Sequence, residues 1–536
     1  MRVLIQQILV PLAHDDVLIL TKAARKVGCT PNQLSGLRVI RRSLDARPRN
    51  PEPLYVLTVE VMLAEDALPA GAVIRDIEVL PDATPAIVPT PRLASTRAPR
   101  PIVVGAGPAG LLAAHTLAQA GACPLLIERG DDVAGRSPKV ARFWNDGILD
   151  PECNALYGEG GAGLFSDGKL TARGKERGRI AEFMALLHAC GANDNVLIDA
   201  EPHVGSDVLL ELVPRLRQRI IAAGGEVRFG ARLDRVIIAG GQLEAVVVNG
   251  EEIPCRQLVL AVGHSARDVY GMLSEAGVTL TPKPFAVGIR LELPQKAIDL
   301  AQYGRFAGSP LLGAASFRLT RREGPGVRAC YSFCMCPGGK VIACASEPDR
   351  LTTNGMSYSK RSLNRGNAGF LVPVDPADYP WHAVPALAGI EFQRDIERAA
   401  FAAAGGTYAV PASRLTDFLA ERTPVSLPAD RSCPRAVPAE LRSILPEFVT
   451  HTLARSLPPM LNELNKVRVD DAMLYAPETR SSSPLRIDRN EAGESINTRG
   501  LFPAGEGAGY AGGIVSSALD GRRAAEALLR AAGPEQ

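Results

Sequence analysis

The feature that most constrains the fold of this 536-residue chain is a glycine-rich turn near residue 105. Gly105-x-Gly107-x-x-Gly110 follows the apolar run Ile102–Val104 and opens an expected helix over residues 111–120. The first glycine permits a tight turn, the second lets the backbone approach a pyrophosphate, and the third allows close helix–sheet packing. The free N–H groups and the dipole of the helix favour negative charge at this end. The pattern predicts a dinucleotide site on a strand–turn–helix unit.

An acidic residue stands where such a site needs one. Glu128 comes about 20 residues after the turn, at the end of a second expected strand, where an acid accepts hydrogen bonds from the adenosine ribose. A carboxylate at this position also disfavours NADP in the same pocket. The alternative is an ordinary solvated strand end, which the spacing makes the weaker interpretation.

The segment between Arg100 and Glu128 contains no Asp, Glu, Lys or Arg, and it is long enough to cross a bilayer. Gly121 and Pro124 interrupt it, and a glycine-rich turn lies near its start. We therefore expect strand, helix and strand rather than a membrane span.

Composition adds little about partners, because the formal charge is only +2, with 46% hydrophobic and 22% charged residues. The 10 cysteines are scattered through the chain, which favours a reducing compartment and a cytoplasmic location. Residues 1–12 are interpreted as a strand rather than a signal peptide.

The pattern of strands, helices and proline predicts an α/β protein with a discontinuous Rossmann-like domain. We expect a small N-terminal α+β domain over residues 1–80, with strands near 2–12, 37–44 and 54–62 and a helix over 16–27, and a Pro-rich linker over 81–98. The nucleotide-binding domain would occupy 99–280 and return at 471–536. Between its halves, residues 281–470 would form an inserted α+β substrate domain.

Three later segments favour FAD over NAD, because they are similar to segments of two-domain flavoproteins. Residues 258–264 resemble the strand and glycine that return from the adenine side, and 501–507 resemble a second FAD motif whose acid, here Glu506, bonds the ribityl chain. The helix after Gly513 would aim its N-terminus at the O2 edge of the flavin. We expect noncovalent FAD and no metal.

The predicted FAD-binding residues come from these segments and from the glycine-rich loop that follows the first helix. They are Gly105, Gly107, Pro108, Ala109, Gly110, Glu128, Arg129, Arg136, Gly160, Gly161, Ala162, Gly163, Ser166, Ala261, Gly263, Gly505, Glu506, Gly512, Gly513 and Ile514.

The chain resembles a bacterial family of uncharacterised FAD-dependent dehydrogenases, distantly related to glutathione-reductase-type flavoproteins. The resemblance runs nearly end to end, and its motifs lie at residues 41–47, 158–170, 283–288, 333–339, 478–484 and 505–513. It implies FAD binding and dehydrogenase activity but no particular substrate. Two departures stand at Leu293, where the family suggests His, and at Ser413, where it suggests Gln. Both would matter if they lined the substrate cavity.

Asp167 and Lys169 are candidate catalytic residues in the glycine-rich loop. In related flavoproteins the equivalent loop approaches the isoalloxazine, so either residue could serve as a general base or anchor a charged substrate. The alternative, which we favour, is that both only hold the FAD loop.

Cys334 and Cys336 form a C-x-C pair whose side chains would point the same way from a regular strand. They could form a redox dithiol, a strained disulfide or half of a metal site. The sequence has no second C-x-C or C-x-x-C to complete four thiolate ligands, and a lone pair more often lines a core.

Four further polar residues have functional and structural interpretations. His203, Asp207 and His264 could relay protons to the flavin, although a lone His at a helix start or strand end is more often structural. Arg480 could pair with an anionic substrate or with phosphate, or else form a surface ion pair.

The N-terminal domain carries basic residues that admit nucleic-acid binding. They are Arg25, Lys26, Arg38, Arg41, Arg42, Arg47 and Arg49. Tyr55 is the only aromatic residue before residue 100, which argues against base stacking and favours a solvated basic face.

Together these features predict a FAD-dependent dehydrogenase that exchanges a hydride with a small organic substrate. The alternatives are a FAD-dependent monooxygenase and a redox-sensing flavoprotein that does not turn over. No second dinucleotide fingerprint occurs in residues 281–470, so we expect the substrate or a partner protein, rather than NAD(P)H, to reduce the flavin.

Overall fold

The computed structural model describes residues 1–47, 50–64, 76–80, 99–171, 176–322, 324, 326–465 and 467–531. The linker expected at 81–98 and the basic residue Arg49 lie outside these ranges.

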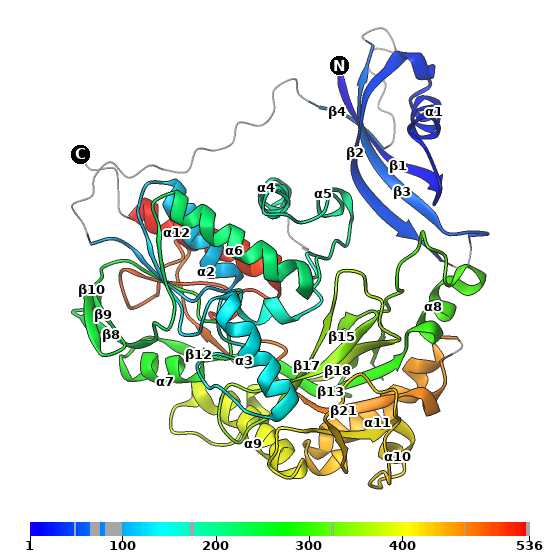
Figure 1. Cartoon of the computed structure of the whole chain (residues 1–536). Coiled ribbons are helices and arrows are strands. Elements are labelled where there is room, and N and C mark those ends of the chain that lie inside the picture. Colours follow the sequence, from blue (N-terminus) through cyan, green and yellow to red (C-terminus); the bar gives the residue numbers. More distant parts are fainter. Residues whose placement is uncertain are drawn as a thin grey trace.

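The N-terminal segment forms a four-stranded antiparallel sheet of order β2-β3-β1-β4 with one helix packed against it, and Figure 1 shows it standing beside the rest of the chain. Its elements are β1 (Arg2–Pro11), α1 (Asp16–Val27), β2 (Leu34–Asp45), β3 (Leu54–Leu63) and β4 (Ile77–Val79). Asp15 caps α1 by accepting from the Leu18 N–H, and Gly28 ends it in the left-handed conformation. The predicted strands and helix of this segment are confirmed.

The second unit is a five-stranded parallel sheet of order β23-β11-β5-β6-β7. Its strands are β5 (Ile102–Val104), β6 (Leu125–Ile127), β7 (Glu226–Arg228), β11 (Leu258–Leu260) and β23 (Leu501–Pro503). Strand, helix and strand occupy the uncharged segment, as predicted, and none of the helices in the described ranges is long and apolar enough to cross a membrane.

Two layers cover this parallel sheet. Val103 and Phe502 share a core with the helices of one face, whereas Ile102 and Leu258 share a core with the other layer. The helical side contains α2 (Pro108–Gln119), α4 (Arg177–Ala189), α6 (Ser206–Ala222) and α12 (Ile514–Ala531), which Figure 1 shows together. The opposite side contains β8 (Leu233–Ala239), β9 (Gln242–Val248), β10 (Glu251–Pro254) and α7 (Arg267–Glu275). The result is the α/β architecture predicted from the sequence.

The third unit is a seven-stranded sheet of order β14-β15-β18-β13-β21-β19-β20, called here the large sheet. It is antiparallel except where β19 pairs with β20. Its strands are β13 (Phe285–Pro294), β14 (Thr320–Arg321), β15 (Cys330–Cys336), β18 (Arg365–Val374), β19 (Val410–Arg414), β20 (Ala436–Pro438) and β21 (Met473–Glu478). Because β21 belongs to this sheet, we propose that the inserted unit ends beyond Glu478 rather than at residue 470.

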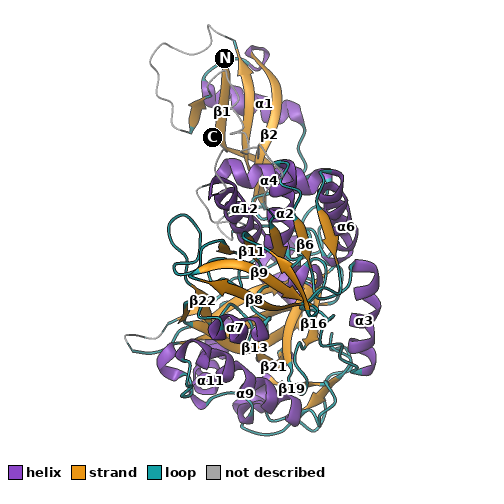
Figure 2. Cartoon of the chain, turned by 90° about the vertical axis from the view of Figure 1, so that its left-hand side faces the viewer, coloured by secondary structure: helices purple, strands orange, loops and turns teal. Residues whose placement is uncertain are grey.

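Further elements surround the large sheet and connect it to the parallel one. They are the hairpin β16 (Gly339–Cys344) and β17 (Thr352–Ser357), the helices α8 (Gln295–Tyr303), α9 (Ala388–Ala403), α10 (Leu415–Leu419) and α11 (Glu447–Asn462), and the strand pair β12 (Leu280–Pro282) and β22 (Leu485–Ile487). Helix α3 (Val133–Asp146) follows β6, and α5 (Asn195–Ile198) follows α4. Figure 2 shows the N-terminal sheet, the parallel sheet and the large sheet stacked one below another.

Candidate functional site

The turn between β5 and α2 has the geometry that its glycines predict. Gly105 has φ +98°, and a Cβ atom there would lie 2.5 Å from the Ala261 carbonyl oxygen. A Cβ at Gly110 would lie 1.8 Å from the Gly105 carbonyl oxygen, so this glycine lets α2 pack against the turn. Around Gly107, in contrast, the nearest atom to such a Cβ is the Gly161 Cα, at 3.9 Å. The backbone at Gly107 is therefore open, as a phosphate cradle requires.

Glu128 directly follows β6 and holds three backbone segments together. Its carboxylate accepts the N–H groups of Ala106 at 2.8 Å and of Gly130 and Gly158, both at 3.0 Å. The side chain is nearly buried and lines the cavity described next. A carboxylate offers about four acceptor positions, so an acceptor for a ribose hydroxyl remains beside these bonds.

A cavity of about 280 Å³ extends from this turn to the large sheet. Most of the predicted FAD-binding residues line it, on what we call the turn side. They are Gly105, Gly107, Pro108, Ala109, Glu128, Arg129, Gly161, Ala162, Gly163, Ser166, Ala261, Gly263, Gly505, Glu506, Gly513 and Ile514. The sheet side is lined by Asp167, Lys169, Phe333, Cys334, Asn354, Glu478, Arg480 and Ser481.

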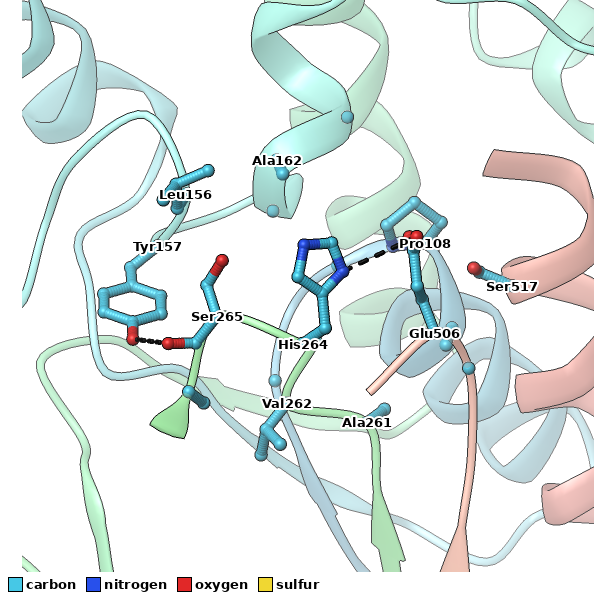
Figure 3. A pocket seen from close by; sticks show the side chains of 18 of the residues that line it. Pro108, Leu156, Tyr157, Ala162, Ala261, Val262, His264, Ser265, Glu506 and Ser517 are labelled. Atoms are coloured by element: carbon cyan, nitrogen blue, oxygen red, sulfur yellow. Dashed lines mark hydrogen bonds and ion pairs between the residues drawn. The ribbon is translucent and has the colours of Figure 1, made fainter. Parts of the chain in front are cut away.

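His264 and Glu506 face one another across the turn side, as Figure 3 shows. His264 Nδ1 lies 3.5 Å from Glu506 Oε1, and both residues line the cavity. Nearby, the Tyr157 hydroxyl donates to the Ser265 carbonyl, and the Arg129 guanidinium lies over the Tyr157 ring with 4.7 Å to its centroid. His264 is thus a cavity residue beside the acid expected to hold the ribityl chain.

Arg136 was predicted to bind FAD but lies behind the loop that lines the cavity. It is fully buried, and it donates to the carbonyls of Asn154, Gly158 and Glu159. Burial lowers the pKa of Arg136 to about 10. Its role is to support the loop backbone, so the prediction of a direct contact is corrected. Gly110, Gly160 and Gly512 also lie outside the cavity lining.

Asp167 forms ion pairs with Lys169 and Arg361. Arg361 binds its carboxylate through two nitrogens, and Lys169 Nζ lies 3.5 Å from Asp167 Oδ2. Burial raises the pKa of Asp167, but the charges of Lys169 and Arg361 outweigh it, so the net pKa is lowered. A carboxylate stabilised in this way is a poor general base. Lys169 differs, because the residue lines the cavity while its Nζ is buried and makes no hydrogen bond.

The two cysteines of the C-x-C pair occupy different positions. Cys334 lines the cavity and is partly exposed, whereas Cys336 is fully buried and lies outside the lining. Both are free thiols, and Cys336 Sγ donates to the Cys334 carbonyl at 3.3 Å. The pair therefore has one accessible and one buried member.

Arg290 lies beneath the sheet side and connects its residues. The guanidinium is fully buried and donates to both Glu478 oxygens, at 2.6 and 2.7 Å. It also donates to the Cys334 carbonyl at 3.1 Å and to Asn354 Oδ1 at 3.2 Å. Burial disfavours the charged form, but Glu478 outweighs it and raises the pKa of Arg290. The guanidinium is a fixed cation below the cavity.

Two of the proposed proton relays are structural in this arrangement. His203 Nε2 lies 3.0 Å from the Ser359 carbonyl, and Asp207 accepts from the Ser359 N–H and hydroxyl. Neither His203 nor Asp207 lines the cavity.

Arg480 lines the cavity, and three of its five N–H donors bind other side chains. Nε and Nη2 donate to Glu397 at 3.0 and 2.9 Å, and Nη1 donates to Ser346 Oγ at 2.6 Å. The ion pair with Glu397 is buried, so the interpretation of Arg480 as part of a surface ion pair is corrected, whereas pairing with an anionic substrate or phosphate stays a prediction.

The two departures from the family pattern do not reach the cavity. Leu293 is fully buried in the core of the large sheet, and the Ser413 hydroxyl, also buried, lies 3.1 Å from the Arg414 carbonyl. Neither residue lines the cavity. They cannot alter the site through direct contact.

Comparison with known proteins identifies the family. The family model "FAD-dependent protein, C-terminal domain-like" matches residues 284–481, "NAD(P)-binding Rossmann-like domain" matches 103–158, and a domain of unknown function (DUF8436) matches 2–62. An uncharacterized protein of Clostridium beijerinckii is 40% identical over 529 residues, which cover 96% of each chain. The chain belongs to this family of FAD-dependent oxidoreductases. FAD is its cofactor, as predicted.

Solved structures resemble the chain only remotely. The flavin-dependent brominase Bmp2 is 12% identical over 81% of this chain and 80% of its own, with a TM-score of 0.37. Glycine oxidase from Geobacillus kaustophilus is 13% identical over 82% and 95%, with a TM-score of 0.33. THI4 of Thermovibrio ammonificans is 19% identical over 34% of this chain and 64% of its own, with a TM-score of 0.24. Scores this low carry no argument about activity.

The residues of this flavoprotein fit a bound FAD. Gly107 leaves open space at the N-terminus of α2, where unbonded N–H groups favour a pyrophosphate. Gly513 and Ile514 place the N-terminus of the 18-residue helix α12 at the same cavity, and a Cβ at Gly513 would meet nothing within 4 Å. The pyrophosphate and the flavin end of an extended dinucleotide therefore each have a helix N-terminus available.

Sequence reasoning missed Arg290 and gave Glu478 no role. Arg290 lies in β13, in which nine of ten residues are buried, including Glu292. A charged residue in so apolar a strand must be paired, because an unpaired buried charge is costly. That signal identifies Arg290 as important, but its partner, nearly 190 residues away, emerges only from the folded chain.

Proposed function

We propose that this flavoprotein is a dehydrogenase that transfers a hydride between FAD and a small organic substrate. The observation that carries the proposal is the continuity of the cavity, which joins the dinucleotide turn to the charged side chains of the sheet side. A substrate on the sheet side would then share one cavity with the cofactor.

On the turn side, the chain binds and orients the cofactor. The first turn of α2 presents N–H groups to the pyrophosphate, Glu128 accepts from the ribose, and Glu506 accepts from the ribityl chain. The N-terminus of α12 favours negative charge at the flavin end. FAD supplies two-electron hydride chemistry when it is bound.

On the sheet side, Lys169 is the residue best placed to bind the substrate. Its ammonium is buried, lies 3.5 Å from the Asp167 carboxylate and makes no hydrogen bond, so a substrate oxygen that reached it would satisfy a donor that is otherwise unpaired. Arg361 fixes Asp167, and thereby the position of the ammonium. We expect a substrate with a carboxylate or a carbonyl oxygen near the bond that is oxidised or reduced.

Anaerobic bleaching of the purified yellow protein by fractionated metabolites tests this proposal. A fraction that contains the substrate should bleach the flavin of the natural protein, whereas Lys169→Met should respond much more slowly to that fraction. Dithionite should bleach both proteins equally, which controls for an intact flavin. If no metabolite fraction bleaches the flavin, the proposal is contradicted. Rapid reoxidation by oxygen with a hydroxylated product would favour a monooxygenase.

A further inference from the structure

The backbone at the C-x-C pair departs from a regular strand. In the pairing of β15 with β18, Phe333 lies opposite Gly369 and Cys336 opposite Asn367, so Cys334 lies within a β-bulge. Cys334 also has φ +42°, a conformation that residues other than glycine rarely adopt. A regular strand would place residues i and i+2 on one face. The bulge instead leaves Cys334 at the cavity and Cys336 buried behind it.

Two cations surround the pair. Arg290 Nη1 donates to the Cys334 carbonyl and lies 3.9 Å from Cys336 Sγ. The charges of Lys169 and Arg290 both favour negative charge on Cys334, against opposition from Asp167. A thiolate at Cys334 therefore lies near two cations, Arg290 and Lys169.

The two thiols also stabilise one another. Interaction between the two side chains is the main cause that lowers the pKa of Cys334, while the same interaction and burial raise the pKa of Cys336 well above its usual value. The opposite directions of these shifts favour the thiolate at Cys334 and the protonated thiol at Cys336. Cys330, in the same strand, is different: burial raises the pKa of its thiol to about 12.

We propose that Cys334 and Cys336 form a dithiol that exchanges two electrons with the flavin. Oxidation of the pair forms one S–S bond between Cys334 and Cys336 and releases the single thiol proton of Cys336. The oxidised flavin is the oxidant, and it takes up the two electrons and one proton. Cys334 is the catalytic member, because it lines the cofactor cavity, and Cys336 is the resolving thiol. The inference rests on the proposed function, because both require a redox-active flavin in this cavity.

Anaerobic dithionite titration of the air-oxidised holoprotein tests the proposal. A flavin and a disulfide together accept four electrons, so complete reduction should consume twice as much dithionite per FAD as a flavin alone. Cys336→Ser should consume half as much as the natural protein, and Cys330→Ala, the control from the same strand, should match the natural protein. Cys334→Ser provides a second variant with the same expected loss.

A count of alkylatable thiols in the denatured protein supplies an independent readout. The oxidised natural protein should expose two fewer thiols than the reduced one, and Cys336→Ser should show no difference. Uptake of only two electrons per FAD, with no change in thiol count, would overturn the dithiol while leaving the oxidoreductase intact. A flavin that dithionite reduces but that no metabolite bleaches would instead contradict the proposed function.

Discussion

The turn side and the sheet side of the cavity are built from different kinds of groups. On the turn side, glycines and backbone N–H groups form most of the lining, and Glu128 ties together the backbone at Ala106, Gly130 and Gly158. On the sheet side, Arg290, Glu478 and Cys334 come from three separate strands and depend on paired charges. A backbone site is sensitive to added bulk, whereas a side-chain site is sensitive to the loss of a charge.

The largest effect should come from removing the cation beneath the sheet side. Arg290→Met leaves Glu478 buried without its bidentate partner, which typically costs about 3–5 kcal/mol of unfolding free energy. Urea unfolding of the holoprotein measures the loss. The double variant Arg290→Met with Glu478→Leu should recover most of it, since no unpaired charge remains.

A surface pair supplies the matched control for that variant. Arg398 and Asp395 are about half exposed, so Arg398→Met should cost less than about 1 kcal/mol. Equal losses for Arg290→Met and Arg398→Met would show that the sheet side does not depend on its buried pair.

Low pH should weaken the ion pairs that Glu347 forms with Arg267 of α7 and with Arg394. Burial raises the pKa of Glu347, but Arg394 and Arg267 outweigh it and lower the pKa from 4.5 to about 2. Its stabilising contribution is therefore complete above about pH 5 and is lost as the pH falls toward 2. That shift corresponds to about 3 kcal/mol.

Unfolding measured between pH 6 and about pH 2 tests this dependence. Glu347→Gln should lower stability at pH 6 and flatten the profile below pH 5. Glu244→Gln, which changes an exposed carboxylate far along the chain, serves as the control and should leave the profile unchanged. If the unfolding free energies of the natural protein and Glu347→Gln change with pH in the same way, Glu347 does not cause the pH dependence.

Gly107→Val should break the turn side without unfolding it. The space around Gly107 admits a side chain, but that side chain would occupy the approach of the pyrophosphate. We expect FAD affinity to fall at least about 100-fold, or about 2.7 kcal/mol, in a flavin fluorescence titration of the apoprotein. The melting temperature of the apoprotein should change little.

The same substitution elsewhere controls for the introduction of valine. Gly178 also has open space around it, so Gly178→Val should retain FAD. Full flavin occupancy in Gly107→Val would show that the pyrophosphate does not bind at this turn.

The smallest effect that we expect is the reduction of the flavin by nicotinamide nucleotides. Within the described part of residues 285–478, no helix follows a parallel strand and a glycine-rich turn, so we expect NADH and NADPH to reduce the flavin slowly. We propose that the substrate or a partner protein supplies the electrons. Stopped-flow mixing measures the rate. Saturable bleaching at roughly 1 per second or faster would show that the large sheet accepts a nicotinamide.

Sequence reasoning succeeded where local chemistry decides the structure. Alternating apolar residues predicted the N-terminal strands, and the helix at Asp16–Val27 has the predicted bounds. The glycine turn and Glu128 were predictable because strand, turn and helix follow one another directly. The prediction that Arg136 contacts the cofactor was wrong, because its position in helix α3 gave no indication that the side chain turns back beneath the loop at residues 154–159.

The N-terminal basic residues illustrate the same limit. Arg42 pairs with Asp199 of the segment after α5, Lys26 with Asp76, and Arg38 with Glu60. Their number in the sequence indicated a charged face, but the partners of Arg42 lie more than 150 residues away. Charge counts therefore could not reveal that this face is partly neutralised.

Local patterns predicted the dinucleotide turn and the parallel sheet, because backbone geometry and hydrophobic periodicity are local properties, and the resemblance of later segments to flavoproteins indicated FAD. Which side chains face the cofactor cavity became known from the folded chain. The pairing of Arg290 with Glu478 requires β13 to lie beside β21, and the bulge at Cys334 arises from the pairing of β15 with β18. Contacts between distant segments depend on strand register and burial, and no short pattern in the chain encodes them.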